Sequence, residues 1–275
     1  MTEVKVGGFT VRYIEDGPKN APLAVFAHCS LAHSGLWRPT IAALSDRWRC
    51  VAIDMPGHGG TERGDESISL QFQAASYVEG VIKALGGGAA HLVGLSLGGA
   101  VMGRVAHRSP ALARSLTMLE PIFFHVVADR DEAAMADDAR VMTPVVKACE
   151  EGRFADGARA FMEGWGQPGQ FDQMPEKAQA AIARSLSYLH PDFALVGSWP
   201  KGQITREGFG AMTLPTLLLE GANTRYSARR IQDELELLMP NVERDAVADA
   251  GHLSPVDNPD AVAQRLRAFW DGVEN

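Results

Sequence analysis

A serine stands at the centre of a short glycine-flanked motif, because residues 94–98 read Gly-Leu-Ser-Leu-Gly. The apolar run His91–Val93 before it predicts a strand, and residues 97–108 after it predict a helix. In a sharp turn between strand and helix, small neighbours relieve crowding around the serine, and the helix N-terminus points at its hydroxyl. We therefore predict that Ser96 is a nucleophile that attacks a carbonyl carbon.

Acyl transfer by a serine also needs a general base and two backbone N–H groups that stabilise the developing oxyanion. His252 lies on the loop between the last predicted strand and the last predicted helix, which suits a base at a strand end. One N–H is expected from Leu97, the residue after the nucleophile. The other is expected from Ser30, in the loop after the strand predicted at 23–28.

The elements that must position these residues alternate between strands and helices. Short apolar runs without polar alternation are typical of parallel strands that are buried on both faces. Strands are predicted at 9–14, 23–28, 50–54, 91–95, 115–119, 215–221 and 242–248, with helices at 36–46, 69–85, 97–108, 227–238 and 259–270. This alternation predicts a doubly wound α/β sheet.

The middle of the chain has a different pattern. Strand-like runs are absent between about 122 and 210, where Ala-rich helical stretches are predicted at 130–150, 153–164 and 175–189. The sequence therefore predicts one α/β core, residues 1–121 and 211–275, interrupted by a helical insertion at 122–210.

Four of these features together resemble the α/β-hydrolase superfamily: the loop at His28, the turn Asp54–Gly59, the motif at 94–98 and Ala250–His252. The resemblance implies a mostly parallel eight-stranded sheet flanked by helices, with the insertion acting as a cap (lid) over the substrate. It specifies the fold and not the substrate, since the superfamily includes carboxylesterases, lactonases, C–C bond hydrolases, cofactor-free perhydrolases and members without hydrolase activity. The family's loop begins His-Gly, whereas Cys29 follows His28 here, so the oxyanion loop is expected to differ in detail.

The acid that would orient His252 is not where the family usually has it, because Asn223 occupies the expected aspartate position. The superfamily's alternative position is the end of the strand before the cap, where this chain has Glu120. We predict Glu120 as the catalytic acid, which would hold the imidazole tautomer and stabilise the imidazolium. Glu220 and Asp249 remain alternatives, as does an arrangement without an acid in which Asn223 orients the histidine.

The substrate is expected to lie between the cap and the core. Side chains of the insertion and the oxyanion loop are candidates for the pocket wall, although the aromatic ones could equally pack the cap onto the core. These candidates are His33, Phe123, Phe124, His125, Trp165, Tyr188 and Trp199.

The composition narrows the class of protein further. The net charge is −8 and Lys and Arg are not clustered, so no nucleic-acid partner is expected. No apolar run is long enough to cross a membrane, the N-terminus does not resemble a signal peptide, and the three cysteines are widely spaced, so we expect a cytoplasmic protein.

The sequence thus predicts a serine hydrolase of a small or medium ester, lactone or related carbonyl compound, acting through an acyl-enzyme. The alternatives are a non-hydrolytic protein that binds a small molecule on the same fold, and a cofactor-free perhydrolase or lyase that uses the same triad. No zinc-type Cys/His spacing, P-loop or dinucleotide fingerprint is found, so no metal or cofactor is expected. The oligomeric state is not predicted.

Overall fold

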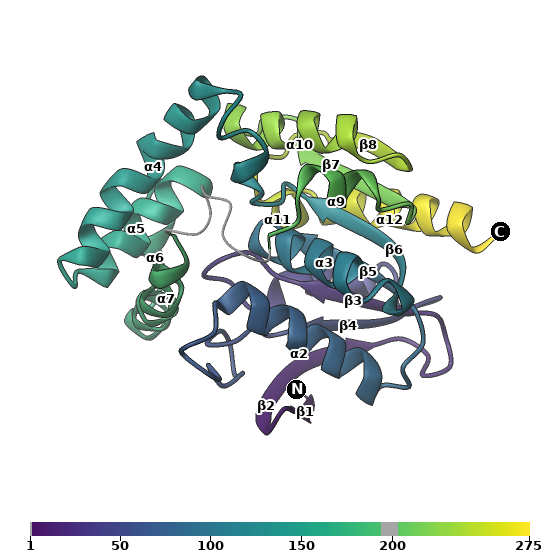
Figure 1. The fold of residues 1–275 in the computed structure, drawn as a ribbon. Helices are drawn as coiled ribbons and strands as arrows, with labels where there is room; N and C mark the ends of the chain where they lie inside the picture. The colour runs from purple at the N-terminus through teal and green to yellow at the C-terminus, as the bar shows by residue number, and fades with distance from the viewer. Residues whose placement is uncertain (1, 194–202) are drawn as a thin grey trace.

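Eight strands form one sheet in the computed structural model, which describes residues 2–193 and 203–275 (Figure 1). The strand order is β1-β2-β4-β3-β5-β6-β7-β8. Strand β2 pairs antiparallel with β1 and β4, and all other neighbours pair in parallel. The strands are Thr2–Val6 (β1), Phe9–Asp16 (β2), Leu23–Ala27 (β3), Arg49–Ile53 (β4), Ala90–Leu95 (β5), Ala113–Leu119 (β6), Thr216–Gly221 (β7) and Val242–Val247 (β8).

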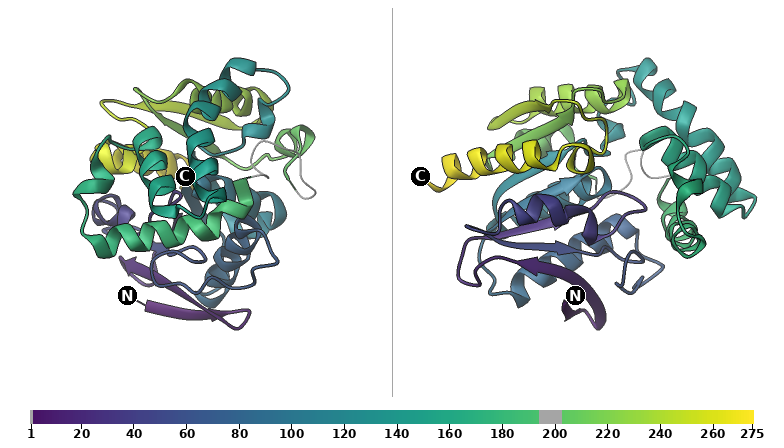
Figure 2. Two further views of the ribbon diagram at one scale, coloured as in Figure 1. Left: turned by 90° about the vertical axis from the view of Figure 1, so that its left-hand side faces the viewer. Right: turned by 180° about the vertical axis from the view of Figure 1, so that it is seen from behind.

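Helices cover both faces of the sheet (Figures 1 and 2). The helices around the sheet are α1 (Arg38–Ala42), α2 (Leu70–Ala84), α3 (Leu97–Arg108), α9 (Arg206–Gly210), α10 (Tyr226–Leu238), α11 (Ser254–Asp257) and α12 (Pro259–Glu274). Short 3₁₀ turns lie at Ser34–Trp37 (η1), Pro110–Leu112 (η2), Phe124–Val126 (η3) and His190–Asp192 (η4). The prediction of a mostly parallel eight-stranded sheet flanked by helices is therefore confirmed.

The central strands separate two apolar cores. In β3, Val25 and Ala27 belong to a cluster with residues of α2, α3 and α10, while Phe26 belongs to a second cluster with residues of α1 and α12. This follows from the period of two along a strand, which sends alternate side chains to opposite faces. Because both faces of the sheet are covered, β3 is apolar at every position. This unbroken apolar run is the pattern from which the strand was predicted.

Helices α4 (Glu132–Glu150), α5 (Phe154–Trp165), α6 (Gln170–Gln173) and α7 (Glu176–Leu189) lie between β6 and β7 in the sequence. Figures 1 and 2 show them together on one side of the sheet. They have a small apolar core of their own, formed by Val145, Cys149, Ala158, Phe171 and Leu186. Ala134, Val141, Trp165 and Leu189 of the same helices belong to the core cluster beside the sheet, and α4 contacts α10, so these helices pack on the rest of the molecule as well as on one another.

One buried carboxylate joins the insertion to the rest of the molecule. Asp137 of α4 accepts hydrogen bonds from the Ser227 N–H (3.1 Å) and hydroxyl (2.8 Å) at the start of α10. It also accepts one from the Arg225 guanidinium at 2.8 Å. Burial would raise the pKa of Asp137, but the Ser227 hydrogen bonds and the charges of Arg225 and Arg140 hold it below its usual value.

Two features of the fold were not predicted from the sequence. The N-terminal strand β1 forms a hairpin with β2, and the stretch expected to be one helix at 36–46 is a 3₁₀ turn followed by the short α1. Among the described residues, no helix has both the length and the apolar character needed to cross a membrane.

Candidate active site

Ser96 occupies a strained turn between β5 and α3. Its φ is +56°, in the left-handed region that non-glycine residues rarely adopt. The two glycines of the motif permit this turn, because a Cβ on Gly94 would lie 2.1 Å from the Gly98 carbonyl oxygen. A Cβ on Gly98 would lie 2.3 Å from the Ala27 carbonyl oxygen. The motif therefore holds a strand, a turn and a helix closer together than any larger residue would allow.

His252 and Glu120 form a buried pair. The Nδ1 atom of His252 is 2.5 Å from Oε2 of Glu120, whose side chain is fully shielded from solvent. Glu120 also accepts hydrogen bonds from the Gly221 N–H at 2.8 Å and the Thr224 hydroxyl at 2.6 Å. Like Ser96, it has a positive φ, of +44°. The carboxylate is thus fixed by three donors at the end of β6.

The electrostatics of this pair keep the carboxyl ionised. Burial alone would raise the pKa of Glu120, but the charge of His252 and the hydrogen bonds from His252, Thr224 and Gly221 outweigh burial and hold that pKa below its usual value. Because a carboxylate only accepts hydrogen bonds, the proton lies on Nδ1 of His252 and leaves Nε2 able to accept one. Ser96 and His252 line the same cavity.

The alternative residues do not contact His252. The Glu220 carboxylate binds the guanidinium of Arg244 at 2.7 Å and lies 3.4 Å from that of Arg229. Across the described residues, no hydrogen bond joins Asp249 to His252. Asn223 donates its backbone N–H to Ala250. The structure therefore brings Glu120 to the histidine and leaves the alternatives apart from it.

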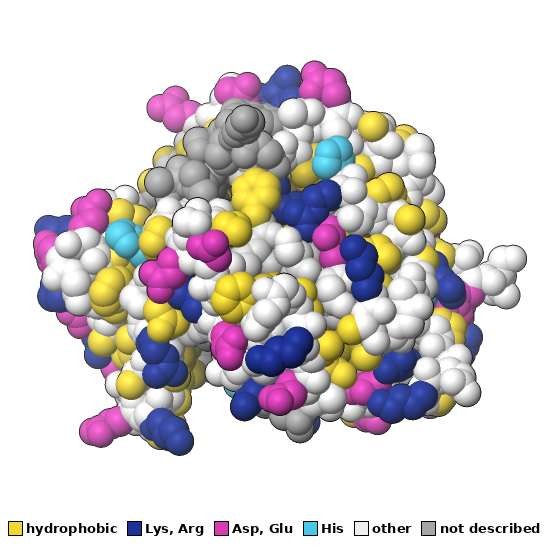
Figure 3. All heavy atoms as spheres, turned by 60° about the horizontal axis from the view of Figure 1, so that its bottom comes forward, with side chains coloured by type: hydrophobic (Ala, Val, Ile, Leu, Met, Phe, Trp, Pro, Cys, Tyr) yellow, Lys and Arg dark blue, Asp and Glu magenta, His cyan; other side chains and the backbone are white. Residues whose placement is uncertain are grey.

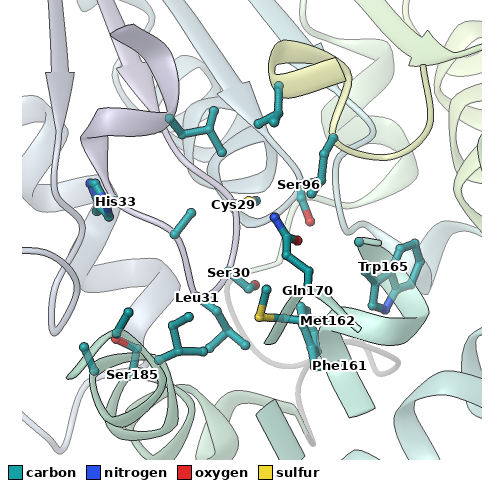
Figure 4. Close-up of a pocket in the computed structure, with 18 of the residues that line it drawn as sticks. Cys29, Ser30, Leu31, His33, Ser96, Phe161, Met162, Trp165, Gln170 and Ser185 are labelled. Atoms are coloured by element: carbon teal, nitrogen blue, oxygen red, sulfur yellow. The ribbon is translucent and has the colours of Figure 1, made fainter. Parts of the chain in front are cut away.

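The N–H groups of Ser30 and Leu97 donate no hydrogen bond to any described residue. Leu97 is the first residue of α3, so its N–H is one of those that a helix leaves unbonded. Ser30 and Ser96 line the same cavity (Figure 4). Next to Ser30, Leu31 has a φ of +62°, which shows that the loop has an unusual local geometry.

Two buried side chains, His28 and Asp54, hold this loop in place through hydrogen bonds to backbone groups. His28 accepts the Met55 N–H at Nε2 (3.0 Å) and donates from Nδ1 to the Cys29 carbonyl (2.7 Å). Asp54 accepts the Ser34 N–H at 2.7 Å and the Gly60 N–H at 2.9 Å. Burial raises the pKa of the Cys29 thiol to about 12, so this thiol is protonated and is a poor nucleophile.

Two cavities reach Ser96. The first cavity, of about 550 Å³, lies between the loop after β3 and the helices α5 to α7 (Figure 4). The second cavity, of about 200 Å³, extends toward α4 and the segment after β6. Ser30, Ser96, Phe161 and Trp165 line both cavities. The ring of Trp165 also packs on the His252 ring, with centroids 4.7 Å apart.

The predicted pocket residues divide into two groups. His33 lines the first cavity, Phe124 the second and Trp165 both. Tyr188, by contrast, packs beneath the Arg63 guanidinium at 4.5 Å and lines a separate cavity.

The remaining candidates do not line either cavity at Ser96. Phe123 and His125 are buried against Phe209, with the Phe123 and Phe209 ring centroids 5.0 Å apart. These side chains instead fill the junction between the segment after β6 and α9. Trp199 lies outside the described residues.

Two residues near Ser96 and His252 were not predicted from the sequence. Thr224 binds the catalytic acid candidate, and Asp138 lines the second cavity. No sequence signal points to Thr224. Asp138 could have been found from the sequence, because it is an acidic residue on the apolar stripe of α4 formed by Ala134, Val141 and Val145 at helical spacing. Among the described residues, no group of three or more His, Cys, Asp or Glu side chains is placed to hold a metal ion.

Comparison with known proteins identifies the family of the chain. The carboxylesterase YbfK of Bacillus subtilis is 26% identical over 268 residues, covering 94% of this chain and 83% of the relative. The 3-oxoadipate enol-lactonase 1 of Acinetobacter baylyi is 25% identical over 275 residues, covering 97% of this chain and 95% of the relative. The crystal structure of an enol-lactonase from Burkholderia xenovorans matches with a TM-score of 0.77 at 20% identity, over 98% of this chain and 100% of that one. The model of the alpha/beta hydrolase family matches residues 24–265, and the chain therefore belongs to that family.

Proposed function

We propose that this enzyme hydrolyses a small or medium carboxylic ester or lactone through a Ser96–His252–Glu120 triad. One observation carries the proposal. The histidine that shares a cavity with Ser96 is bonded through Nδ1 to a buried carboxylate, which leaves Nε2 as a base. The relatives named carboxylesterase and enol-lactonase support hydrolysis of an ester or lactone bond.

In the proposed mechanism, Nε2 of His252 takes the proton of the Ser96 hydroxyl while its oxygen attacks the carbonyl carbon. The N–H groups of Ser30 and Leu97 stabilise the negative oxygen of the tetrahedral intermediate. The imidazolium then gives its proton to the leaving alcohol, and Glu120 stabilises the imidazolium throughout. Water, activated by His252, attacks the acyl-enzyme and releases the acid.

The substrate would lie between the core, residues 1–121 and 211–275, and a cap formed by residues 122–210. The first cavity is lined mainly by apolar side chains, among them Leu31, Phe161, Met162 and Ile182. Such a wall favours an apolar acyl or alcohol group. We therefore include an apolar substrate of moderate size in the proposal.

Labelling with a fluorophosphonate probe and hydrolysis of p-nitrophenyl butyrate test the nucleophile. We expect the wild-type protein to be labelled once, at Ser96, and the Ser96→Ala variant to lose labelling and at least about 10⁴-fold in kcat. Ser185→Ala is a matched control, because Ser185 also lines the first cavity but its hydroxyl is bonded to the Gly57 carbonyl. Unlabelled wild-type protein, or equal losses in the two variants, would contradict the proposal.

The same assay separates the alternatives. A non-hydrolytic binding protein would show neither labelling nor turnover. A perhydrolase would be labelled at Ser96, but it would transfer the acyl group to hydrogen peroxide in preference to water. Rates of ester consumption with and without peroxide distinguish these outcomes.

A further inference from the structure

The second cavity differs from the first in its chemistry. Its wall combines aromatic and aliphatic side chains with two carboxylates, Asp138 and Asp192, and none of its described lining residues is Lys or Arg. The apolar members are Ile122, Phe124, Met142, Val146, Phe161, Trp165, Leu189 and Phe193. Acidic groups in the wall of a small apolar cavity make its potential more negative where water screens charge weakly, and the Arg225 guanidinium beyond this wall offsets part of that effect.

The two carboxylates of this cavity are not equivalent. Asp192 is bonded to the Ser69 hydroxyl at 2.8 Å and to the Gln71 N–H at 3.2 Å, so it fixes the start of α2. Asp138 accepts no hydrogen bond and forms no ion pair with any described residue. Its helix neighbour Asp137 takes the hydrogen bonds of Arg225. Among the described residues, Asp138 therefore has no hydrogen-bond donor or ion-pair partner.

The position of Asp138 makes this unusual. It is half-buried on the stripe of α4 that otherwise carries Ala134, Val141 and Val145, and a carboxylate there is costly unless it is paired. Burial raises the pKa of Asp138 to about 6, an effect that Arg225 reduces and Asp137 increases. The carboxyl is thus mostly ionised at neutral pH, and a bound cation would relieve its unfavourable environment.

Aromatic rings beside the carboxylate indicate which kind of cation would fit. Phe124, Phe161 and Trp165 line the same cavity, and the Phe124 and Trp165 rings are edge-to-face with centroids 6.4 Å apart. The Arg225 guanidinium already lies over the Trp165 ring, 5.4 Å from its centroid, so Phe124 and Phe161 are the main candidates for contact with a further cation. Aromatic faces attract ammonium groups, and quaternary ammonium ligands are bound in this way. A hydroxyl or amide group would satisfy Asp138 but would gain little from the rings.

We propose that the second cavity is a subsite for an ammonium group carried by the substrate, with Asp138 as its counter-charge. The preferred substrates are then carboxylic esters that bear a positively charged nitrogen a few bonds from the carbonyl carbon. This inference rests on the proposed function, because Ser96 lines the cavity and positions the carbonyl there. Asp138 contacts the substrate's charge in this proposal and takes no part in proton transfer.

Matched substrate pairs test the subsite. The p-nitrophenyl ester of 4-(trimethylammonio)butanoate is compared with that of 5,5-dimethylhexanoate, in which an uncharged tert-butyl group replaces the trimethylammonium group. The measured quantity is the ratio of kcat/KM for the charged ester to kcat/KM for the neutral one. We expect Asp138→Asn to lower this ratio about tenfold or more, because it removes the counter-charge without changing the side chain's size.

The control variant is Glu163→Gln, which removes the same charge from an exposed position of α5 outside the cavities. We expect it to leave the ratio within about twofold, since exposed charges are screened. A ratio that Asp138→Asn leaves unchanged, or that both variants lower equally, would overturn the proposal. Equal loss of both substrates in Asp138→Asn would also overturn it, because Asp138 would then only support the structure.

The pH dependence of the same ratio is a second readout. The charged groups that face Asp138 are Arg225, from the start of α10, Asp137 on its own helix, and Asp192 across the cavity. Any pH effect on the chemical steps common to the two esters cancels in the ratio. We expect the wild-type ratio to rise with pH around 6, as Asp138 ionises, and to stay flat in Asp138→Asn. A wild-type ratio independent of pH between 5 and 7.5 would count against the subsite.

Binding without hydrolysis separates this inference from the proposed function. Titration calorimetry with butyltrimethylammonium needs no catalysis, and we expect Asp138→Asn to weaken binding about tenfold or more. If neither ester is hydrolysed but this difference is found, the proposed hydrolysis fails and the ammonium subsite stands. If both esters are hydrolysed but binding does not depend on Asp138, the subsite fails and the hydrolase stands.

Discussion

Replacing Glu120 with glutamine tests the least conventional member of the proposed triad. The Oε1 atom of Glu120 accepts the Gly221 N–H at 2.8 Å, while Oε2 accepts both the Thr224 hydroxyl and His252 Nδ1. In Glu120→Gln the amide oxygen must take the first position, because an amide NH₂ there would face another donor. The NH₂ group is then directed at His252.

This orientation changes the tautomer of the histidine. An NH₂ group donates, so Nδ1 of His252 must accept and the ring proton moves to Nε2. A protonated Nε2 cannot take the proton from the Ser96 hydroxyl. We expect kcat to fall about 10⁴-fold, as when a triad aspartate becomes asparagine, which corresponds to about 5 kcal/mol of lost transition-state stabilisation.

The assay is hydrolysis of p-nitrophenyl butyrate, with Glu220→Gln as the matched control. Glu220 ends the neighbouring strand β7 but binds Arg244 and Arg229, so its loss is expected to change kcat by less than about threefold. Circular dichroism would establish that both variants are folded. If Glu120→Gln retained more than a tenth of the wild-type kcat, or if Glu220→Gln lost as much, the assignment of the acid would be refuted.

Three further substitutions have expected outcomes. Thr224→Val removes one hydrogen bond to the Glu120 carboxylate. We expect it to lower the unfolding free energy, measured by urea unfolding, by about 1.5–3 kcal/mol and kcat for ester hydrolysis by about tenfold. Unchanged values would show that this hydrogen bond is unimportant. Gly98→Ala places a Cβ 2.3 Å from the Ala27 carbonyl oxygen, so we expect more than about 3 kcal/mol of destabilisation in the same assay, and a stable variant would contradict the close approach. Asp137→Asn weakens the junction between α4 and α10 and is expected to cost about 2–4 kcal/mol; an unchanged midpoint would show that the junction does not limit stability.

The strand ends could be predicted from the sequence because buried parallel strands carry an unbroken apolar signal. The run before the Ser30 loop is unbroken, and those before Ser96 and Glu120 are mostly apolar, so the residues that follow them must lie at the carboxyl edge of the sheet. Strand β1 could not be found in this way. Its residues, Thr2–Val6, are mostly exposed and pair with β2 alone, so they need no apolar run.

The direction of side chains in irregular segments could not be predicted from the sequence. Phe123 and Phe124 are adjacent and chemically identical, yet the first packs on Phe209 and the second lines the second cavity. No periodicity constrains these residues at the start of η3, so both were predicted to line the pocket. The sequence narrowed the acidic partner of His252 to a few candidates, because several acidic residues follow strands. Only the three-dimensional arrangement shows that Glu220 forms an ion pair with Arg244 instead.

The mixed surface of the molecule carries little further information. On the face in Figure 3, acidic and basic side chains are interspersed and no broad region of one sign is seen. This pattern is ordinary for a protein surface. The informative charges are the buried ones, and Asp138 belongs to them because it interrupts an apolar stripe.

The positive φ of Ser96 also has an evolutionary meaning. A serine with a φ of +56° costs the folded state about 1 kcal/mol or more relative to glycine, which adopts this conformation freely. Drift under selection for stability alone would therefore replace the serine with glycine. Descendants of this chain that no longer need the hydroxyl are expected to carry glycine at this position and to unfold at higher denaturant concentration. In the proposed mechanism, the serine is retained for its hydroxyl at the expense of stability.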